Sequence, residues 1–577
     1  MGEIIFQGIA AAEGIAIGKA YRYTPIQLSI PTRQAESPSE EIARFEAACE
    51  QAHQELQAVK ANLNKLVDSD TAAIFDAHAM MLDDPMLREG VKNRILAGQL
   101  AEKAVQETSE ELAAMLQGME DELFASRAAD ILDVGHRILR ILLGIKDTTL
   151  DALQEPVIIV ADDLTPSDTV NLKPELTLGF CTSAGGITSH TSILARTLGI
   201  PAVVGLGEQA LAQIPHGGTL ALNGSSGVVV VNPSKTTIEK FEKIRATQST
   251  RMESMLKNAR QEARTADGRR VEVMANIGDI NSAREAVEYG AEGVGLLRTE
   301  FLYLQDTHPP SEERQIAAYQ AIFHAMQGRE IIVRTLDIGG DKPPSYLDFE
   351  DEMNPFLGWR AIRICLDDIV LFKTQLRAIL KAAVGHNVRL MYPMINGIEE
   401  LQRANAVLEE VYSELQAEGV AHQRNIPVGI MVETPAAAVM ADVLARQCDF
   451  FSLGTNDLTQ YTLAVDRTNE RVAHLYQPLD PAVLRLIKQT IDAGHAQGIP
   501  VGMCGELAGM VKAIPILLGL GLDEFSMVPR VVPEAKWLIR HLTDQQAKEI
   551  AEQALGYPTA AEVDAYMQTV LSQIGVY

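Results

Sequence analysis

Residues 184–196 read Ala-Gly-Gly-Ile-Thr-Ser-His-Thr-Ser-Ile-Leu-Ala-Arg, a turn of small residues that leads to a histidine flanked by hydroxyls. The apolar run just before it, residues 176–181, has the length and composition of a buried strand. After it, apolar residues keep helical spacing as far as Leu198, and Gly199 follows. The pattern predicts a strand, a tight turn and a helix that begins near His190.

A histidine at the start of a helix is suited to accepting a phosphoryl group. Unpaired N–H groups and the positive end of the helix dipole disfavour an imidazolium, so the ring stays neutral and nucleophilic. The same groups stabilise the negative charge of a phosphoryl group. An incidental histidine in a strand–turn–helix is the alternative, and Gly185 and Gly186 alone favour it. The run of hydroxyls from Thr188 to Ser192 reverses that preference.

Length and composition indicate a globular protein of several domains. The chain has 577 residues, of which 47% are hydrophobic and 22% charged. No apolar run reaches the length of a membrane span, and the start does not resemble a signal peptide. Five scattered cysteines show no metal-binding spacing and suit a reducing compartment. We therefore expect a cytoplasmic protein that does not bind membranes.

The net charge of −27 argues against nucleic acid as a partner. A basic protein surface, or a small anion held by a local arginine cluster, is the more plausible kind of partner. Composition alone does not choose between them.

Short strands open the chain, within Ile4–Ala10 and Gly14–Ala20, around a glycine turn. We expect them to pair with the later segment that carries His190. The first domain is then discontinuous, an α/β domain made of residues 1–35 and 145–232.

The intervening residues 36–144 are predicted to form an inserted helical bundle. Ser37–Glu40 reads as a capping box with proline at the first helical position. Apolar residues then alternate spacings of three and four, which is typical of a helix packed on antiparallel neighbours. That series is Ile42, Phe45, Cys49, Ala52, Leu56, Val59, Leu63 and Leu66. Further helices are predicted at Ala73–Met81, Pro85–Leu96, Ala101–Gln117 and Arg127–Leu143.

This insertion is strongly acidic. Residues 36–140 contain 21 acidic and 10 basic residues, a net charge of −11. A solvated bundle surface and a docking face for a basic partner protein both explain that charge. His78 by itself is more often a packing histidine than a functional one, so we place it outside the catalytic set.

The second half has the pattern of a (β/α)₈ barrel. Residues 233–263 read as a helical linker, and residues 264–577 as the barrel. Eight short apolar runs recur with helical stretches between most of them. They are Val271–Ile277, Gly293–Leu297, Glu330–Val333, Val388–Pro393, Pro427–Val432, Asp449–Leu453, Pro500–Met503 and Glu524–Met527.

Polar residues follow these runs, where such barrels place their chemistry. They are Arg298, Arg334, Arg360, Glu433, Asn456, Asp457, Arg467 and Cys504. Each alone is commonly part of a salt bridge between loops. Together, the arginines repel one another unless an anion lies between them, and a ligand with phosphate and carboxylate supplies one. Glu433 and Asp457 suit Mg²⁺. Cys504 is an inert buried thiol, or a proton donor if an enolate forms beside it.

The motif around His190 closely resembles the phosphohistidine signature of Enzyme I, the phosphoenolpyruvate–protein phosphotransferase of the bacterial sugar phosphotransferase system. The segment Asn354–Arg363 is a second long match, and the likeness runs from about Gly8 to the C-terminus. The resemblance implies a phosphohistidine domain, a helical platform for the phosphocarrier HPr, and a barrel that binds phosphoenolpyruvate and dimerises. It implies transfer of the phosphoryl group to His190 and then to HPr, the first step of sugar uptake, with release of pyruvate.

The resemblance also assigns roles to the residues at the strand ends. Arg298, Arg334 and Asn456 are expected to hold the phosphate of phosphoenolpyruvate, and Arg467 its carboxylate. Arg360 lines the phosphoryl path, Glu433 and Asp457 bind Mg²⁺, and Cys504 protonates the enolate. Thr169 falls where family members place a hydroxyl that hydrogen-bonds the active histidine. A threonine that caps a helix is the alternative.

Two alternatives remain at this point. A pyruvate phosphate dikinase or phosphoenolpyruvate synthase has a related motif, but it needs an ATP-binding domain for which the chain shows no phosphate-cradling loop. A catalytically altered paralogue, acting as a phosphorylatable regulator, is the second. Met510, where the family usually has Asp, and the unusual segment 528–533 keep that alternative open.

Overall fold

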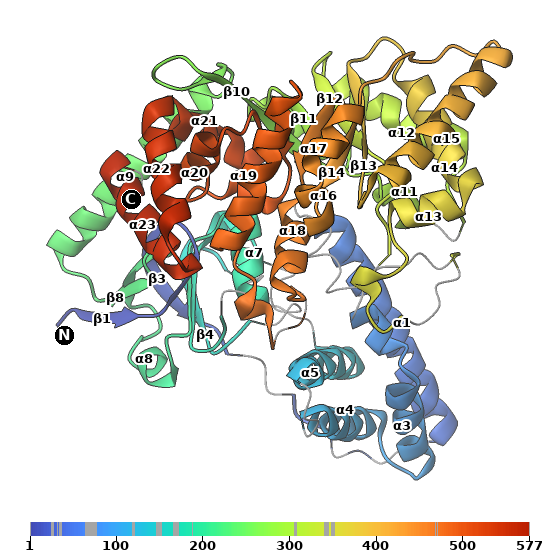
Figure 1. The fold of residues 1–577 in the computed structure, drawn as a ribbon. Helices are drawn as coiled ribbons and strands as arrows, with labels where there is room; N and C mark the ends of the chain where they lie inside the picture. The colour runs from blue at the N-terminus through green and yellow to red at the C-terminus, as the bar shows by residue number, and fades with distance from the viewer. Residues whose placement is uncertain are drawn as a thin grey trace. The chain divides into compact units, whose positions relative to one another are not determined.

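The computed structural model forms two compact units, Met1–Thr250 and Arg251–Tyr577 (Figure 1). It describes residues 2–24, 28–31, 33, 37–63, 78–117, 122–145, 150, 153–164, 172–186, 189–304, 308–339, 346–347, 352–467, 469 and 471–575. Thr169 lies outside the described residues.

A mixed sheet is the centre of the first unit. Its strand order is β1-β8-β7-β3-β4-β5-β6-β2. The strands are β1 (Ile4–Gln7), β2 (Ile9–Ala12), β3 (Ile15–Arg22), β4 (Val157–Ala161), β5 (Thr177–Thr182), β6 (Ala202–Val204), β7 (Thr219–Asn223) and β8 (Val228–Val231). β3 pairs antiparallel with β7 and parallel with β4. β2 pairs antiparallel with β6, the strand that follows the His190 segment, so the expected pairing of the first strands with that segment is confirmed.

Two short helices are described in this α/β part. α7 (His190–Leu198) begins at the histidine, as the sequence predicts. Ser189 is its N-cap, and Gly199 ends it with a φ of 65°, a left-handed conformation that glycine adopts without strain. α8 (Glu208–Ala212) follows β6.

Among the described residues of the insertion between β3 and β4, four helices have both ends defined. They are α1 (Pro38–Leu63), α3 (Pro85–Leu96), α4 (Ala101–Gln117) and α5 (Glu122–Leu142). The predicted seam of α1 is buried at Phe45, Cys49, Ala52 and Leu56, and its later members fall among side chains that are not described. Residues 78–82 are helical, whereas the rest of the predicted 73–81 helix lies outside the described residues. α5 begins five residues before the predicted Arg127.

α9 (Lys235–Asn258) follows the last strand of this sheet. Phe241, near its start, packs against Ile15, Ala221 and Val230 of the sheet. The helix forms within the segment predicted as a helical linker.

The second unit is a closed parallel barrel. Its strands are β10 (Arg270–Ile277), β11 (Gly293–Leu297), β12 (Glu330–Arg334), β13 (Val388–Tyr392), β14 (Val428–Val432), β15 (Phe450–Leu453), β16 (Val501–Met503) and β17 (Glu524–Met527). β10 pairs in parallel with both β11 and β17, which closes the ring. All eight predicted runs are strands, with ends that differ by one residue at most.

Helices lie between these strands and after the last of them, and their buried side chains belong to the core of the barrel. They are α10 (Ile280–Glu288), α11 (Phe301–Leu304), α12 (Glu312–Ala325), α13 (Ile362–Asp367), α14 (Ile369–Ala382), α15 (Ile398–Ala417), α16 (Pro435–Val439), α17 (Ala441–Leu444), α18 (Thr455–Leu463), α19 (Pro481–Ala496), α20 (Ile514–Leu520), α21 (Val532–Arg540), α22 (Asp544–Gly556) and α23 (Ala560–Ile574). Strand β9 (Ala263–Arg264) pairs antiparallel with β10. None of the helices in the described part of the chain is long and apolar enough to span a bilayer. Met510 packs against the barrel core, so the departure from the family's Asp is an apolar contact.

Candidate active site

The carboxyl ends of the barrel strands bring together most of the polar residues singled out from the sequence. We call this set the C-terminal rim: Arg298, Arg334, Arg360, Glu433, Asn456, Asp457, Arg467 and Cys504. Arg334 is the last residue of β12, and Glu433 comes directly after β14. Asn456 and Asp457 lie in the first turn of α18, and Cys504 follows β16.

A chain of buried ion pairs connects the rim. Asp337 accepts from Arg334 at 2.9 Å and from Arg360 at 3.0 Å, and Arg360 also reaches Asp457 at 3.1 Å. Burial alone would raise the pKa of Asp337, but the two arginines outweigh it and hold the pKa below its ordinary value. The repulsion expected between the arginines is therefore offset by the protein's own carboxylates.

Asp337 and Glu300 are rim residues that the sequence reasoning did not assign. Glu300 Oε1 accepts from Arg334 Nη2 at 3.0 Å and from the Asp337 backbone N–H at 3.2 Å. The available signal was local: Asp337 comes three residues after Arg334, and Glu300 comes two residues after Arg298. Arg298 itself is exposed, and its charge contributes to the lowered pKa of Asp337.

Glu433 is a buried carboxylate close to a second one. Its Oε1 accepts from the Met394 backbone N–H at 2.6 Å. Burial, together with the charges of Asp457 and Asp337, raises the pKa of Glu433 to about 8. A hard divalent cation between Glu433 and Asp457 would relieve that repulsion, so this pair of oxygen donors fits Mg²⁺.

Asn456 is held in one orientation by Glu506. Its Nδ2 donates to Glu506 Oε1 at 3.0 Å, and its Oδ1 accepts from the Glu506 backbone N–H at 2.9 Å. Arg467 is partly buried, and its backbone N–H donates to Gln460 Oε1 at 3.1 Å. Burial favours the neutral form of Arg467, but Asp457, Tyr476 and Glu506 together outweigh it and raise the pKa of the guanidinium. Arg467 therefore stays charged.

Cys504 is buried, and it keeps its proton at neutral pH. Burial raises the pKa of its thiol to about 11. The sulfur lies 3.9 Å from the Leu453 carbonyl oxygen. Asn276 Nδ2 donates to the Cys504 carbonyl at 2.9 Å, which fixes the backbone at the strand end. A protonated thiol in this position is able to act as an acid.

His190 lies in the first compact unit, at the first position of α7. Ser189 Oγ accepts from the Ser192 backbone N–H at 3.4 Å, and Ser192 Oγ donates to the Gly186 carbonyl at 2.6 Å. Thr191 is buried, and its hydroxyl lies 3.3 Å from both Asp163 Oδ1 and the Leu164 carbonyl. These bonds fix the turn, so that His190 starts the helix at its positive end.

The helical insertion carries an apolar pocket. It is lined by Met81, Asp84, Met86, Leu87, Leu112, Met115, Leu116, Ile131 and Val134. Met80 and Met86 are exposed at 75% and 55%. Methionine side chains adapt to the shape of a partner, so an exposed methionine surface is typical of a protein interface. His78 is fully buried between Asp130 and Asp133, at 3.3 and 3.6 Å, which agrees with a packing role.

Family models match the chain in three parts. The PEP-utilising enzyme N-terminal model matches residues 7–127, the mobile-domain model residues 153–227, and the PEP-binding-domain model residues 252–544.

Relatives that match over nearly the whole chain share close to half of its residues. Proteins named phosphoenolpyruvate-protein phosphotransferase from Bacillus sp. (strain S) and Haemophilus influenzae are 46% and 44% identical, over 99% and 98% of this chain and 99% of their own length. The relative of that name from Staphylococcus carnosus is 45% identical over 96% of this chain and 97% of its own. A solution structure of an Enzyme I protein is 42% identical and covers 42% of this chain and 99% of its own, with a TM-score of 0.36. The resemblance stated from the motifs is confirmed: the chain belongs to the phosphoenolpyruvate–protein phosphotransferase family of enzymes, also called Enzyme I.

Proposed function

We propose that this protein transfers the phosphoryl group of phosphoenolpyruvate to His190 and then to a histidine of an HPr-type phosphocarrier, as the first step of sugar uptake. The observation that carries the proposal is the position of His190 at the first residue of α7, behind the Ser189 N-cap. That position favours a neutral ring before transfer and a phosphoryl group after it. The names of the relatives describe the same reaction.

The rim residues divide the work of binding phosphoenolpyruvate. Arg298, Arg334 and Asn456 bind the phosphate, and Arg467 binds the carboxylate. Guanidinium groups suit both anions because their planar N–H donors match two oxygens at once. Without substrate, Asp337 holds Arg334 and Arg360 in place, at 2.9 and 3.0 Å. The arginines are therefore preorganised before the phosphate arrives.

Glu433 and Asp457 are the residues that would hold Mg²⁺. When bound, the ion supplies positive charge against the phosphate oxygens during transfer. Arg360, which pairs with Asp457 at 3.1 Å, lines the path of the phosphoryl group and adds further positive charge.

The proposed transfer needs only phosphoenolpyruvate, His190, the Cys504 thiol and a proton from solvent. The bond between phosphorus and the enol oxygen breaks, a phosphorus–nitrogen bond to His190 forms, and the oxygen keeps the electron pair as an enolate. The Cys504 thiol gives its proton to C3 of the enolate, which yields pyruvate. The thiolate then regains a proton from solvent. A thiol with a pKa of about 11 is protonated at the start of each cycle.

His190 has to reach two places, the rim on the barrel and the carrier on the helical insertion. We therefore assign the domains as residues 1–35 with 145–232, 36–144, 233–263 and 264–577, and we propose a swivel about the linker between Val231 and Arg264. The methionine-lined pocket of the insertion, whose lining includes Met81, Met86 and Met115, is the proposed contact for the carrier. The net charge of −11 over residues 36–140 favours a carrier with a basic face.

The protein is further proposed to be a cytoplasmic homodimer that associates through the barrel. Its five cysteines are free and buried, as suits a reducing compartment. Light scattering of the purified protein should give the mass of two chains. The mass of one chain would contradict the proposed dimer.

The experiment that tests the function is uptake of label from radiolabelled phosphoenolpyruvate, with and without Mg²⁺. Wild-type protein should take up label that is acid-labile, base-stable and Mg²⁺-dependent, and pass it to the carrier. His190→Ala should take up none, whereas His216→Ala, which removes an exposed histidine of the same unit, should behave as wild type. Label that persists in His190→Ala, or no label at all, would contradict the proposal. A single round of labelling without repeated turnover of phosphoenolpyruvate would favour a regulator.

A further inference from the structure

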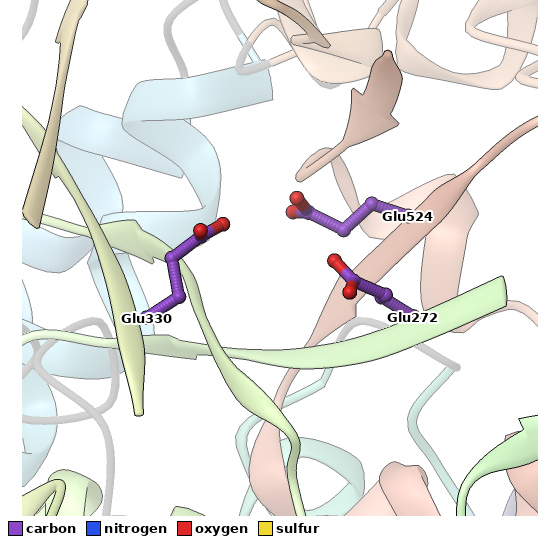
Figure 2. Close-up of side chains that lie close together, drawn as sticks. All are labelled: Glu272, Glu330 and Glu524. Atoms are coloured by element: carbon purple, nitrogen blue, oxygen red, sulfur yellow. The ribbon is translucent and has the colours of Figure 1, made fainter. Parts of the chain in front are cut away.

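Three glutamates meet at the opposite end of the barrel from the rim. Glu330 is the first residue of β12 and Glu524 the first residue of β17, and Glu272 lies near the start of β10. Glu272 and Glu524 are direct partners in the parallel pairing of their strands. One carboxylate oxygen of each residue lies within 4.8 Å of those of the other two. Figure 2 shows the three carboxylates pointing toward a common space. We call these three residues the glutamate cluster.

The charges around the cluster do not balance it. Arg389 Nη2 lies 2.9 Å from Glu330 Oε2, and its guanidinium lies 5.6 Å from the centre of the Phe450 ring. Arg270 Nη2 lies 3.5 Å from Glu272 Oε1, a long and exposed contact. Neither arginine forms an ion pair with Glu524 among the described residues. Three carboxyl groups thus share two arginines: Arg389 pairs with Glu330, and Arg270 also pairs with Glu262 and Glu292 outside the cluster.

Two oxygens of the cluster are buried and unsatisfied. Glu524 is 8% exposed, and its Oε1 has no hydrogen-bond partner within the described part of the chain. Oε1 of Glu330 is also buried and has no hydrogen-bond partner within the described part of the chain. Leaving such oxygens without a partner is costly in a folded protein, so each of them calls for a ligand.

The neighbouring strands leave room for the Glu524 carboxylate. A Cβ at Gly295 of β11 would collide with Glu524 Oε1, and a Cβ at Gly502 of β16 would come to 3.2 Å from it. Neither position has a left-handed φ, so backbone conformation does not explain why glycine occurs there. The two glycines therefore serve the close approach of this side chain.

We propose that Glu272, Glu330 and Glu524 bind a hard divalent cation at the N-terminal end of the barrel. Carboxylate oxygens are the ligands that such cations prefer. Three oxygens spaced evenly around one Ca²⁺ lie roughly 4.0–4.5 Å apart, and around one Mg²⁺ roughly 3.5–3.6 Å. The oxygens of the cluster, all within 4.8 Å of one another, therefore close on Ca²⁺ with a small movement and on Mg²⁺ or Mn²⁺ with a larger one. Glu272 is only partly buried, which gives the ion a way in.

The site has a structural role. It ties β12 to β10 and β17, the neighbouring strands at the closure of the ring. Burial, reinforced by Glu330 and Glu272, raises the pKa of Glu524 to about 8, which reflects how poorly the cluster tolerates its own charge without a cation. The proposal is independent of the function of the rim.

Counting bound Mn²⁺ by electron paramagnetic resonance, on full-length protein freed of metal, tests the proposal. Glu524→Gln should bind one Mn²⁺ per chain fewer than wild type, whatever the rim binds. Glu433→Gln, a rim variant, should retain the site in the glutamate cluster. Glu288→Gln removes an exposed carboxylate of α10 and should bind as wild type. A Glu524→Gln protein that binds as many Mn²⁺ ions as wild type would overturn the proposal.

Two further measurements guard against a folding defect. Glu272→Gln removes the most accessible ligand and should weaken the Mn²⁺ affinity of this site at least tenfold, with an unchanged circular dichroism spectrum. Saturating Ca²⁺ should raise the Tm of Glu433→Gln by about 5 °C and should not raise that of Glu433→Gln/Glu524→Gln. Equal shifts in the two proteins would contradict the site.

Discussion

Asp337 and Glu524, buried at the two ends of the barrel, lie in opposite electrostatic surroundings. At the C-terminal rim, Asp337 lies between Arg334 and Arg360, and its pKa is held below the ordinary value. At the N-terminal end, Glu524 faces Glu272 and Glu330, and its pKa rises to about 8. Burial favours the protonated acid at both ends, so the neighbouring charges decide the outcome.

This difference indicates what each end can bind. The rim pairs the arginines Arg334 and Arg360 with carboxylates that hold them in place, and its guanidinium groups suit an anionic substrate. The glutamate cluster carries an excess of negative charge and suits a cation. The rim thus offers arginines and the opposite end offers carboxylates, because the two ends of the same strands lie on opposite faces of the barrel.

The largest expected effect comes from breaking the ion pairs of the rim. Arg360→Ala leaves Asp337 and Asp457 buried with one partner fewer, and should lower the free energy of unfolding of the barrel by about 3–5 kcal/mol. Urea denaturation followed by circular dichroism measures this change. Arg485→Ala removes an exposed arginine of α19 and should stay within about 0.5 kcal/mol of wild type. Equal losses of unfolding free energy in the two variants would show that the buried ion pairs stabilise the barrel no more than an exposed arginine does.

The second prediction uses the opposite pKa shifts of the two ends. A raised pKa makes Glu524 stabilise the folded state below pH 4 and lose that contribution as the pH rises through about 8. In the presence of a chelator, wild type should therefore lose up to about 4 kcal/mol more than Glu524→Gln between pH 5 and pH 8. Asp337, with its lowered pKa, acts with the opposite sign, and its contribution is lost only as the pH falls through its folded pKa. Parallel curves for wild type and Glu524→Gln would refute this contrast.

The third prediction concerns the space around Glu524. Gly295→Ala places a methyl group against Glu524 Oε1 and the Ser526 Cβ, and should cost about 1–3 kcal/mol through overpacking. Gly278→Ala has nothing within 4 Å of the new methyl group and should be close to neutral. The Tm values of the two variants give the comparison. Adding Glu524→Ala to Gly295→Ala should recover part of the loss, and no recovery would mean that Ser526 alone causes the clash.

The smallest effect is expected for an exposed ion pair. Lys488 and Asp492 form an i, i+4 pair on the surface of α19, where solvent screens both charges. Lys488→Met should change the free energy of unfolding by no more than about 0.5 kcal/mol. A loss close to that of Arg360→Ala would mean that burial does not separate the two kinds of pair.

Much of the fold follows from local patterns in the sequence. The eight barrel strands and the start of α7 at His190 could be predicted because apolar runs, glycines and caps are encoded within a few residues. The start of α5 was predicted less well, since its first turn, 122–126, lacks a clear N-terminal signal. Distant pairings, such as that of β1 with β8, rested on the expectation that the first domain is discontinuous.

The residues missed from the sequence are those whose role depends on distant partners. Asp337 was not assigned, because its contact with Arg360 links residues 23 positions apart across a loop. The glutamate cluster was not foreseen either. Glu272, Glu330 and Glu524 are spread over 252 positions, and only the closure of the barrel brings their carboxylates together.

Mass spectrometry of the His190 peptide after incubation with phosphoenolpyruvate and Mg²⁺ tests the account most directly. Wild type and Glu524→Gln should both carry a phosphoryl group on His190, whereas Arg334→Met and Glu433→Gln should lose nearly all of it. That result would place the chemistry at the C-terminal rim and leave the glutamate cluster a structural site. Full phosphorylation of His190 in the two rim variants would contradict the account.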